Sequence, residues 1–264
     1  EYVSELLEDD KSVFGITVTL GENAVLDRNF RWFTSECAKE SEIEYSYDKN
    51  FSEKFVVKAQ CERVPKAFPV FNFGLISSYK IIFLNKFSAK IKNLKPGKVY
   101  YRIKNTGDDF QKCSPIYSLK GLDFEDDFKF TVFADSQGMT KSDYGAFSEV
   151  FEKAYENEHE TDFMVHLGDF VDDGNNEMLW KWLLESDVWK NMPIVPLSGN
   201  HDGRIGAKSV KCGVENSLVS HFYLENPIYE KNSKGAYFSF VYKNATFVVL
   251  NTNAVNSEDE LDEK

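Results

Sequence analysis

The sequence predicts an N-terminal all-β sandwich over residues 1–122, followed by an α/β domain over residues 123–264. Short segments with period-two patterning fill the first part, whereas apolar strands alternate with helical segments in the second. The polar and acidic segment GLDFEDD at 121–127 separates the two patterns and is the expected linker.

The first part contains several short segments that alternate or consist of residues favouring strands. They are ITVTL at 16–20, EIEYSYD at 42–48, KFVVKAQ at 54–60, FSAKIKNL at 87–94 and KVYYRIKN at 98–105. Pro96 and Gly97 lie between the last two, and this pair suits the centre of a type II turn joining antiparallel strands. Short strands separated by turns are typical of a β-sandwich.

The second part alternates between strands and helices. Strands are expected at 131–135, 162–169 and 193–200, helices over 142–158 and 175–190, and a strand pair within 235–253 that turns near Lys243 and Asn244. This alternation implies a sheet with helices on its faces.

Composition limits the classes of function. Of 264 residues, 42% are hydrophobic and 15% aromatic, so the chain can bury a sizeable core. The net charge of −12 argues against a nucleic-acid backbone as the main partner. An acidic chain also fits binding of multivalent cations, although solubility alone can explain the charge.

Membrane and cysteine signals are weak. No run of about 18 apolar residues occurs, so no membrane-spanning helix is expected. The four cysteines show no CxxC spacing, which argues against a zinc knuckle. A single disulfide among Cys37, Cys61 and Cys113 remains open.

Polar side chains follow each of the three predicted α/β strands. Asp135 and Gln137 follow the first, Asp169 the second, and Asn200 and His201 the third. Because the carboxyl ends of neighbouring parallel strands meet at one edge of a sheet, these side chains should converge there. Hard divalent cations prefer such a mixture of carboxylate, amide and imidazole ligands, and Asp169 is the natural bridge between two ions.

Each motif alone is a weak signal, and the conjunction decides. DSQ and GNHD are common turn sequences, whereas GDFVDDG places acids and glycines directly after an apolar strand. Asp169 follows Asp135 by 34 residues and precedes Asn200 by 31, which is one helical crossover each. The alternative is a degenerate site that holds little metal.

These motifs resemble those of the calcineurin-like metallophosphoesterase superfamily, Asp-x-His, Gly-Asp-x-x-Asp and Gly-Asn-His-Asp/Glu. The first part resembles the fibronectin type III-like domain of purple acid phosphatases, including LKPGKVYYRI at 94–103, and segment 235–253 resembles the strand pair after their third motif. For the second part, this resemblance implies a four-layer α/β/β/α sandwich that is incomplete at its C-terminus.

The resemblance also implies roles for individual residues. Asp135 and Asp169 would hold a first metal ion, Asp169 would bridge to a second, and Asn200 would bind the second. His201 would donate a proton or stabilise charge at the leaving oxygen, and Asp172 would steady His201. The cofactors would be two divalent ions from the set Mn, Fe, Zn, Mg or Ca.

Gln137 departs from the family pattern, which has histidine there. In purple acid phosphatases this position is not a ligand, and a tyrosine at the position of Asp172 binds iron instead. The iron–tyrosinate pair should therefore be absent here. Gln137 is expected to contact the first metal through its amide oxygen, which favours harder ions such as Mn²⁺, Mg²⁺ or Ca²⁺.

Two further residues are candidates for substrate binding. Arg204 could grip a phosphate oxygen, with a solvated loop arginine as the alternative. His221 could line the pocket, with packing as the alternative.

The predicted function is hydrolysis of a small phosphoester by a dinuclear metal centre, in an extracellular or cell-envelope location. The competing hypothesis is a non-catalytic surface or binding protein with a degenerate metallophosphoesterase domain. The family completes its site with histidines from two later segments, and after His201 the chain has only His221. We therefore expect these residues to be the front part of a longer protein. Expressed alone, they should bind divalent ions weakly and hydrolyse phosphoesters poorly or not at all.

Overall fold

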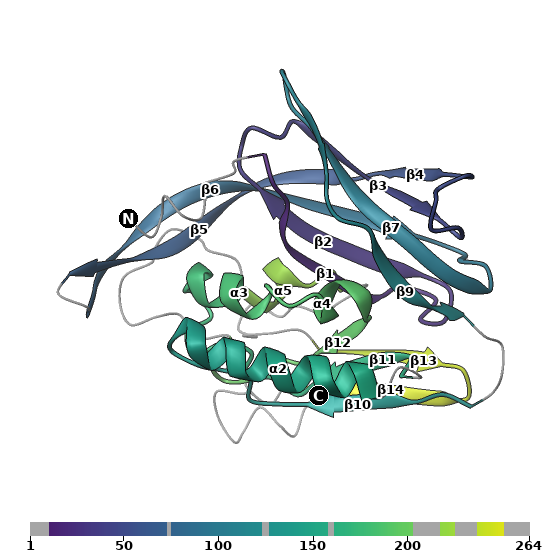
Figure 1. Cartoon of the computed structure of the whole chain (residues 1–264). Coiled ribbons are helices and arrows are strands. Elements are labelled where there is room, and N and C mark those ends of the chain that lie inside the picture. Colours follow the sequence, from purple (N-terminus) through teal and green to yellow (C-terminus); the bar gives the residue numbers. More distant parts are fainter. Residues whose placement is uncertain are drawn as a thin grey trace.

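The computed structural model describes residues 11–72, 75–122, 127–157, 161–202, 217–224 and 237–250. Figure 1 shows an upper part built from strands and a lower part in which helix α2 covers a sheet. The helices α3, α4 and α5 lie between the two parts (Figure 1). The predicted fold class, a β-rich N-terminal part followed by an α/β part, is confirmed.

Two sheets face each other in the upper part. The first contains β1 (Phe14–Leu20), β2 (Arg28–Thr34), β6 (Leu75–Ile91) and β5 (Gln60–Asn72), and the second contains β4 (Phe55–Lys58), β3 (Glu40–Ser46), β7 (Gly97–Thr106), β8 (Gln111–Cys113) and β9 (Tyr117–Leu122). Buried residues of both sheets, among them Trp32, Phe87, Tyr101 and Ile103, form one apolar core between them. The sandwich arrangement follows from this shared core.

The turn at Pro96 and Gly97 has a different role from the predicted one. Gly97 has a φ of 111°, a conformation that glycine adopts readily. The strands on either side, β6 and β7, belong to different sheets, so the turn carries the chain across the sandwich. The prediction of a turn that joins two antiparallel strands was wrong, because local turn chemistry does not specify which strands pair.

Three parallel strands form the centre of the lower part. They are β10 (Phe130–Phe133), β11 (Phe163–His166) and β12 (Ile194–Pro196), in that order. Helix α2 (Lys141–Asn157) connects the first two strands, as predicted. Strands β13 (Phe238–Tyr242) and β14 (Ala245–Val249) form an antiparallel pair that is joined by a turn at Lys243 and Asn244, also as predicted.

The predicted helix over 175–190 is two helices. Helix α3 (Glu177–Leu183) is capped by Leu184, and α4 (Val188–Asn191) begins after Asp187. The Ser186 hydroxyl accepts a hydrogen bond from the backbone N–H of Val188, a local contact that competes with a continuous helix. Another helix, α5 (Ser217–His221), packs nearby.

The sheet continues across the predicted domain boundary. β12 pairs in parallel with β1 through Ile194 and Thr19, which gives a seven-stranded sheet in the order β10-β11-β12-β1-β2-β6-β5. The two parts are therefore joined by backbone hydrogen bonds as well as by helices. The division into domains at 1–122 and 123–264 stays a prediction.

The β13–β14 hairpin packs on the sheet through aromatic rings. Phe163 of β11 lies against Tyr242 and Phe247, with ring centroids 4.8 and 5.6 Å apart. Stacked and edge-to-face pairs of this kind add to the burial of apolar area. The described residues thus give helix, sheet and sheet layers of the expected sandwich.

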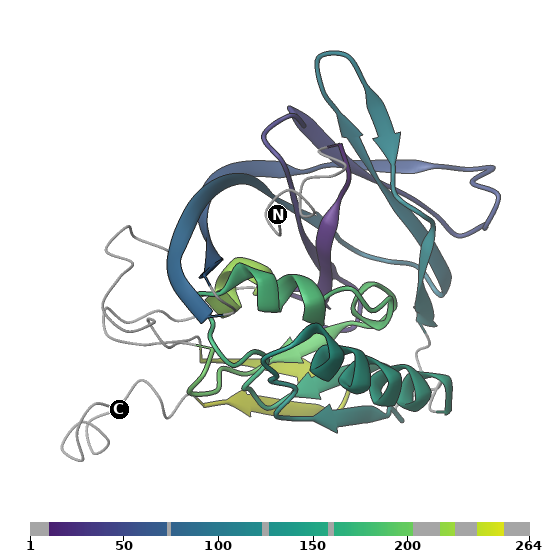
Figure 2. The ribbon, with the colours of Figure 1, turned by 60° about the vertical axis from the view of Figure 1, so that its left-hand side comes forward.

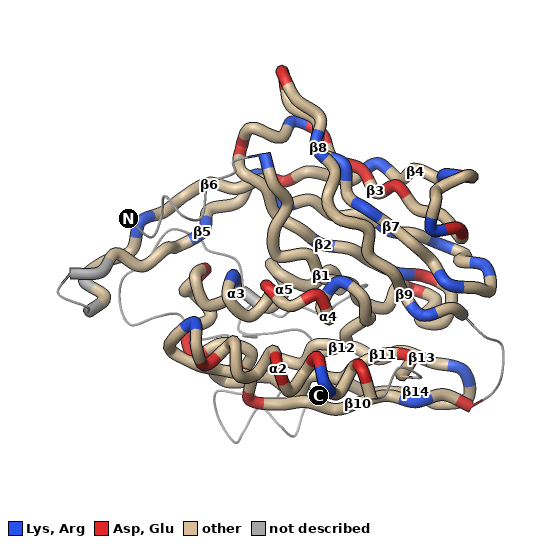
Figure 3. Tube along the Cα trace, in the orientation of Figure 1, with Lys and Arg blue, Asp and Glu red and all other residues tan. Residues whose placement is uncertain are grey.

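Charges of opposite sign are interspersed on the β-sandwich (Figure 3). On the face of β3 and β7 turned away from the core, Glu44 pairs with Arg102 at 2.7 Å, and Glu42 pairs with Lys104 at 2.9 Å. Cys37, Cys61 and Cys113 are exposed, and none of these described cysteines forms a disulfide. Among the described helices, none has the length and apolar character needed to cross a membrane.

Candidate metal centre

The ends of β10, β11 and β12 bring the predicted ligand segments together. The backbone N–H of Asp135 donates to the carbonyl oxygen of Gly168 at 3.1 Å, and that of Gln137 donates to the carbonyl oxygen of Asp169, also at 3.1 Å. The N–H of His201 donates to Asp169 Oδ1 at 2.8 Å. Asp169 therefore lies between the first and third segments, as the sequence predicted.

Asp135 and Asp169 share an unusual backbone conformation. Their φ angles are 56° and 54°, in the left-handed region that few residues other than glycine adopt. Such conformations persist where the surroundings hold them, and they concentrate at functional sites. Both residues are predicted metal ligands, so the strain falls where the chemistry is expected.

Glycines allow the second and third segments to approach each other closely. A Cβ atom on Gly168, whose φ is 106°, would lie 2.3 Å from the backbone nitrogen of Gly199. A Cβ atom on Gly199 would lie 2.1 Å from Asp169 Oδ1. Because neither neighbour can yield that much, only glycine fits at these two positions.

Asp202 fixes the backbone of both segments. Its carboxylate, only 1% exposed, accepts hydrogen bonds from Asp169 N at 2.9 Å, Gly199 N at 2.8 Å, Phe170 N at 2.8 Å and Val171 N at 3.4 Å. Burial raises the pKa of this carboxyl to about 6, although the N–H donors act in the opposite direction. Asp202 was not among the predicted site residues, although it is the fourth residue of the GNHD motif.

His166 and Ser136 connect the first two segments behind the ligands. The N–H of Gly168 donates to His166 Nδ1 at 3.3 Å, and Ser136 Oγ donates to the carbonyl oxygen of Phe170 at 3.0 Å. The 3.0 Å contact between His166 Nε2 and Ser136 Oγ must then use a proton on Nε2. Burial lowers the pKa of His166 to about 3, which keeps the ring neutral in this tautomer.

His201 is held by the residue that the family resemblance assigned to it. Its Nδ1 donates to the carbonyl oxygen of Asp172 at 2.7 Å and lies 3.6 Å from the Asp172 carboxylate oxygen Oδ1. The carbonyl can only accept, so Nδ1 carries a proton and Nε2 is the nitrogen left for chemistry. The contact between His201 and Asp172 runs mainly through the backbone of Asp172.

The donor set fits a hard cation better than a thiolate- or histidine-binding metal. Among the described residues, no group of three or more His, Cys, Asp or Glu side chains gathers around one point. The predicted ligands Gln137 and Asn200 carry amide oxygens instead, and Gln137 Oε1 is buried without a hydrogen-bond partner. A buried amide oxygen normally has a partner, so this atom is suited to contact an ion.

The structure describes two of the three remaining predicted residues, Asn200 and His221. Asn200 is exposed at the end of the third segment. His221 is buried against Trp180, with ring centroids 4.2 Å apart, and its Nε2 lies 2.9 Å from Glu177 Oε1. These contacts agree with the packing alternative for His221. Arg204 lies outside the described residues.

The part of the sequence that forms this site matches the model of a known protein family. The model described as calcineurin-like phosphoesterase matches residues 128–262, more than half of the 264-residue chain. The chain belongs to the calcineurin-like phosphoesterase family. The matched region contains the candidate metal centre from Asp135 to Asp202, and the predicted membership in this family is confirmed. No curated protein matches the sequence.

The solved structure of a purple acid phosphatase shares the fold of this chain. A purple acid phosphatase, PPD1 from yellow lupin (Lupinus luteus) seeds, superposes with a TM-score of 0.63 at 13% sequence identity, over 88% of this chain. The chain spans 43% of the length of that phosphatase. The carbohydrate-binding module of the muscle glycogen-targeting subunit of protein phosphatase-1 has a TM-score of 0.28 at 12% identity, over 42% of this chain and 73% of that one, too low to bear on the fold.

Proposed function

We propose that the chain hydrolyses small phosphoesters with the help of two divalent metal ions. Asp135, Gln137 and Asp169 would hold one ion, and Asp169 and Asn200 the other. Bound ions of this kind polarise phosphoryl oxygens and activate water. The oxygen donors favour Mn²⁺, Mg²⁺ or Ca²⁺ over softer metals.

The observation that carries the proposal is the way Asp169 is held. Its backbone N–H is bound by Asp202, its side-chain Oδ1 by the N–H of His201, and its carbonyl oxygen by the N–H of Gln137. Asp169 is thus held from both neighbouring segments, and its carboxylate is oriented by the N–H of His201. Such fixation of charged groups before the substrate binds is what electrostatic catalysis requires.

His201 is the residue suited to proton transfer. With Nδ1 donating to the carbonyl oxygen of Asp172, the ring is fixed, and Nε2 can carry a proton to the leaving oxygen. The Asp172 carboxylate oxygen Oδ1 lies 3.6 Å from the same Nδ1 atom, on the side of the ring opposite to the one left for the substrate.

Turnover of p-nitrophenyl phosphate and bis(p-nitrophenyl) phosphate tests the proposal, with Mn²⁺ added and with a chelator. The parent chain should require Mn²⁺, and Asp169→Ala should lower the rate by at least about 100-fold. Asp187→Ala, at an exposed acid between α3 and α4, is the matched control and should leave the rate unchanged.

Two outcomes would contradict the proposal. Equal rates for the parent and Asp169→Ala would remove Asp169 from the site. Calorimetric binding of Mn²⁺ without turnover of either ester would favour the non-catalytic binding protein instead.

A further inference from the structure

The longest hairpin among the described residues reaches from the β-sandwich to the loop beside the candidate metal centre. β5 and β6 pair from Gln60 and Ser88 to Asn72 and Leu75. In Figure 1 this hairpin extends beyond the rest of the sandwich, and in Figure 2 it curves down beside α3. A strand pair of this length can therefore contact segments far away in the sequence.

Two polar contacts join the hairpin to the segment between Asp172 and α3. The hydroxyl of Tyr79, on β6, donates to Asp173 Oδ2 at 2.9 Å. Lys66 Nζ, on β5, lies 3.0 Å from Glu177 Oε2, and both side chains are buried. The hairpin thus contacts residues 173 and 177, at the two ends of this short segment.

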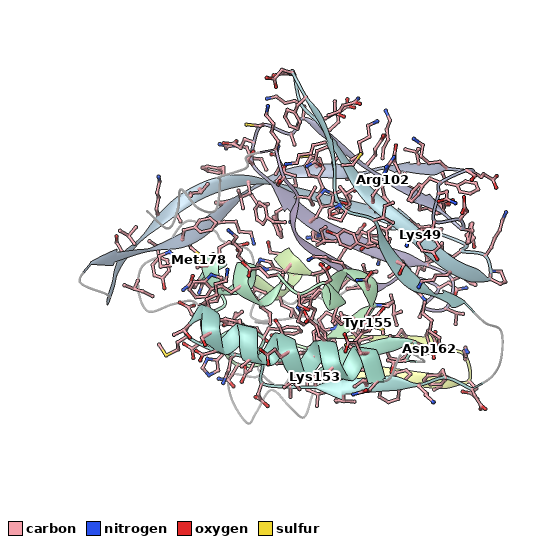
Figure 4. All side chains as sticks on the ribbon, in the orientation of Figure 1. Lys49, Arg102, Lys153, Tyr155, Asp162 and Met178 are labelled. Atoms are coloured by element: carbon pink, nitrogen blue, oxygen red, sulfur yellow. The ribbon has the colours of Figure 1, made fainter. Side chains whose placement is uncertain are left out.

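An apolar contact supports the same arrangement. Met178 of α3 packs with Val64, Phe68 and Leu84 of the hairpin and with Phe33. Figure 4 shows Met178 on the side of α3 that faces the hairpin. Burial of this cluster holds the hairpin against α3. The hairpin would therefore stay in place without the hydrogen bond of Tyr79.

The segment that Tyr79 contacts leads directly to His201. Asp173 Oδ1 accepts from the N–H of Asn175 at 3.1 Å, and the N–H of Gly174 donates to the carbonyl oxygen of His201 at 3.2 Å. The carbonyl oxygen of the preceding residue, Asp172, accepts a hydrogen bond from His201 Nδ1. Two backbone contacts therefore link this segment to His201, on either side of Asp173.

We propose that Tyr79 is a positioning residue for His201. Its hydrogen bond to Asp173 fixes the loop from Asp172 to Asn175, and this loop contacts His201. The β-sandwich then contributes to the reaction through its β5–β6 hairpin. Burial and the neighbouring Asp173 carboxylate raise the pKa of the Tyr79 hydroxyl above its usual value, so it remains a donor. The consequence for turnover rests on the proposed function, whereas the consequence for the His201 ring does not.

Tyr79→Phe removes only the hydroxyl and is the first test. With the metal-free protein, the imidazole ¹⁵N and ¹H signals of His201 should shift or broaden, and the amides of Gly174 and Asn175 should exchange faster. Tyr101→Phe is the matched control, because Tyr101 donates to the carbonyl oxygen of Lys190 at 2.6 Å and also joins the sandwich to a helix. This variant should leave the His201 signals unchanged.

Kinetics supply the second readout. Tyr79→Phe should lower kcat by about tenfold with little change in KM, as expected for loss of a hydrogen bond to a charged group. The loss should grow as the leaving group of the aryl phosphate becomes poorer, since His201 would protonate it. Tyr101→Phe should retain the leaving-group dependence of the parent.

Asp173→Ala completes the experiment. If Tyr79 acts through Asp173, the double variant Tyr79→Phe/Asp173→Ala should perturb the His201 signals no more than Asp173→Ala alone. Unchanged His201 signals and unchanged exchange at Gly174 in Tyr79→Phe would overturn the positioning role. A parent chain without turnover would count against the proposed function only, because the resonance measurements would still decide the role of Tyr79.

Discussion

The carboxylate of Asp202 binds the backbone of Asp169. Asp202 Oδ2 accepts the Asp169 N–H at 2.9 Å, and the same oxygen accepts the Gly199 N–H at 2.8 Å. One atom thus joins the segment after β11 to the segment after β12. Because Asp169 has a φ of 54°, this contact is also what holds its left-handed backbone in place.

Asp202→Asn should therefore destabilise the site and the fold together. An amide offers only one acceptor oxygen to N–H groups that now share two, so hydrogen bonds to a charged group are lost. We expect the free energy of unfolding to fall by about 2 kcal/mol in urea denaturation at pH 7. Asp187→Asn, at an exposed acid, is the control and should change it by less than about 0.5 kcal/mol. Equal stability of the two variants would mean that the four N–H groups find other partners.

Gln137 should show a conflict between stability and metal binding. Its buried Oε1 has no partner, and an unsatisfied buried acceptor costs about 1–3 kcal/mol. Gln137→Leu should raise the unfolding free energy of the metal-free protein by about 1 kcal/mol and weaken Mn²⁺ binding in calorimetry. Gln60→Leu, at an exposed position, should leave Mn²⁺ binding unchanged. Weaker stability together with unchanged Mn²⁺ affinity would show that Oε1 is not a ligand.

The buried ion pair between Lys66 of the hairpin and Glu177 of α3 should make the free energy of unfolding depend on pH in the acid range. Burial would raise the pKa of the Glu177 carboxyl, but His221 and Lys66 outweigh it and lower the pKa to about 2. A lowered carboxyl pKa gives stability that is complete above about pH 4.5 and is lost as the pH falls towards 2. The loss should be on the order of 3 kcal/mol.

Glu177→Gln tests this by comparison with the parent. At pH 6 the variant should be less stable, because Lys66 is left buried without its carboxylate. Between pH 4.5 and 2.5 the difference in unfolding free energy should narrow. In this range the Glu177 carboxyl takes up a proton in the unfolded parent but not in the folded parent, and the variant has no carboxyl at this position. A constant difference across this range would show that Glu177 does not titrate as the structure implies.

Local sequence patterns predicted the lower part better than the upper part. The strands leading to Asp135, Asp169 and Asn200 are apolar runs closed by glycine and acids, and they form neighbouring parallel strands as expected. The β5–β6 hairpin and β2 were largely missed, because their residues mix charged and apolar types without a clean period. Their pairing depends on contacts between distant residues, such as Arg28 with Ile91.

The candidate site was predicted in the same uneven way. Motif spacing predicted Asp135, Asp169 and His201, and the structure brings their segments together, since residues that end neighbouring parallel strands lie at one edge of the sheet. Their roles as ligands or acid stay predictions. Asp202 is the last residue of GNHD, but the motif alone does not show that its carboxylate binds backbone N–H groups. Tyr79 had none, because its contact with Asp173 spans 94 residues and exists only through the hairpin.

His166 should lower the stability of the protein in weak acid. The ring is 2% exposed, and burial lowers its pKa to about 3, below the ordinary value of 6.5. The unfolded chain therefore takes up a proton below about pH 6.5, whereas the folded chain does not until pH 3. Stability from this residue is complete above pH 6.5 and falls by about 1.4 kcal/mol per pH unit below it.

His166→Gln removes the titrating group while keeping an N–H that can donate to Ser136. The variant should be less stable at pH 7, because the ring stacks on Phe170 with centroids 3.7 Å apart. Urea denaturation at pH 7.0, 6.0 and 5.0 should show the difference between parent and variant shrinking by about 2 kcal/mol over this range. The remaining histidines are common to both proteins, so their titration cancels in the comparison. A difference that stays constant, or a His166 imidazole signal that titrates near pH 6.5, would show that the ring is not held neutral behind Asp169.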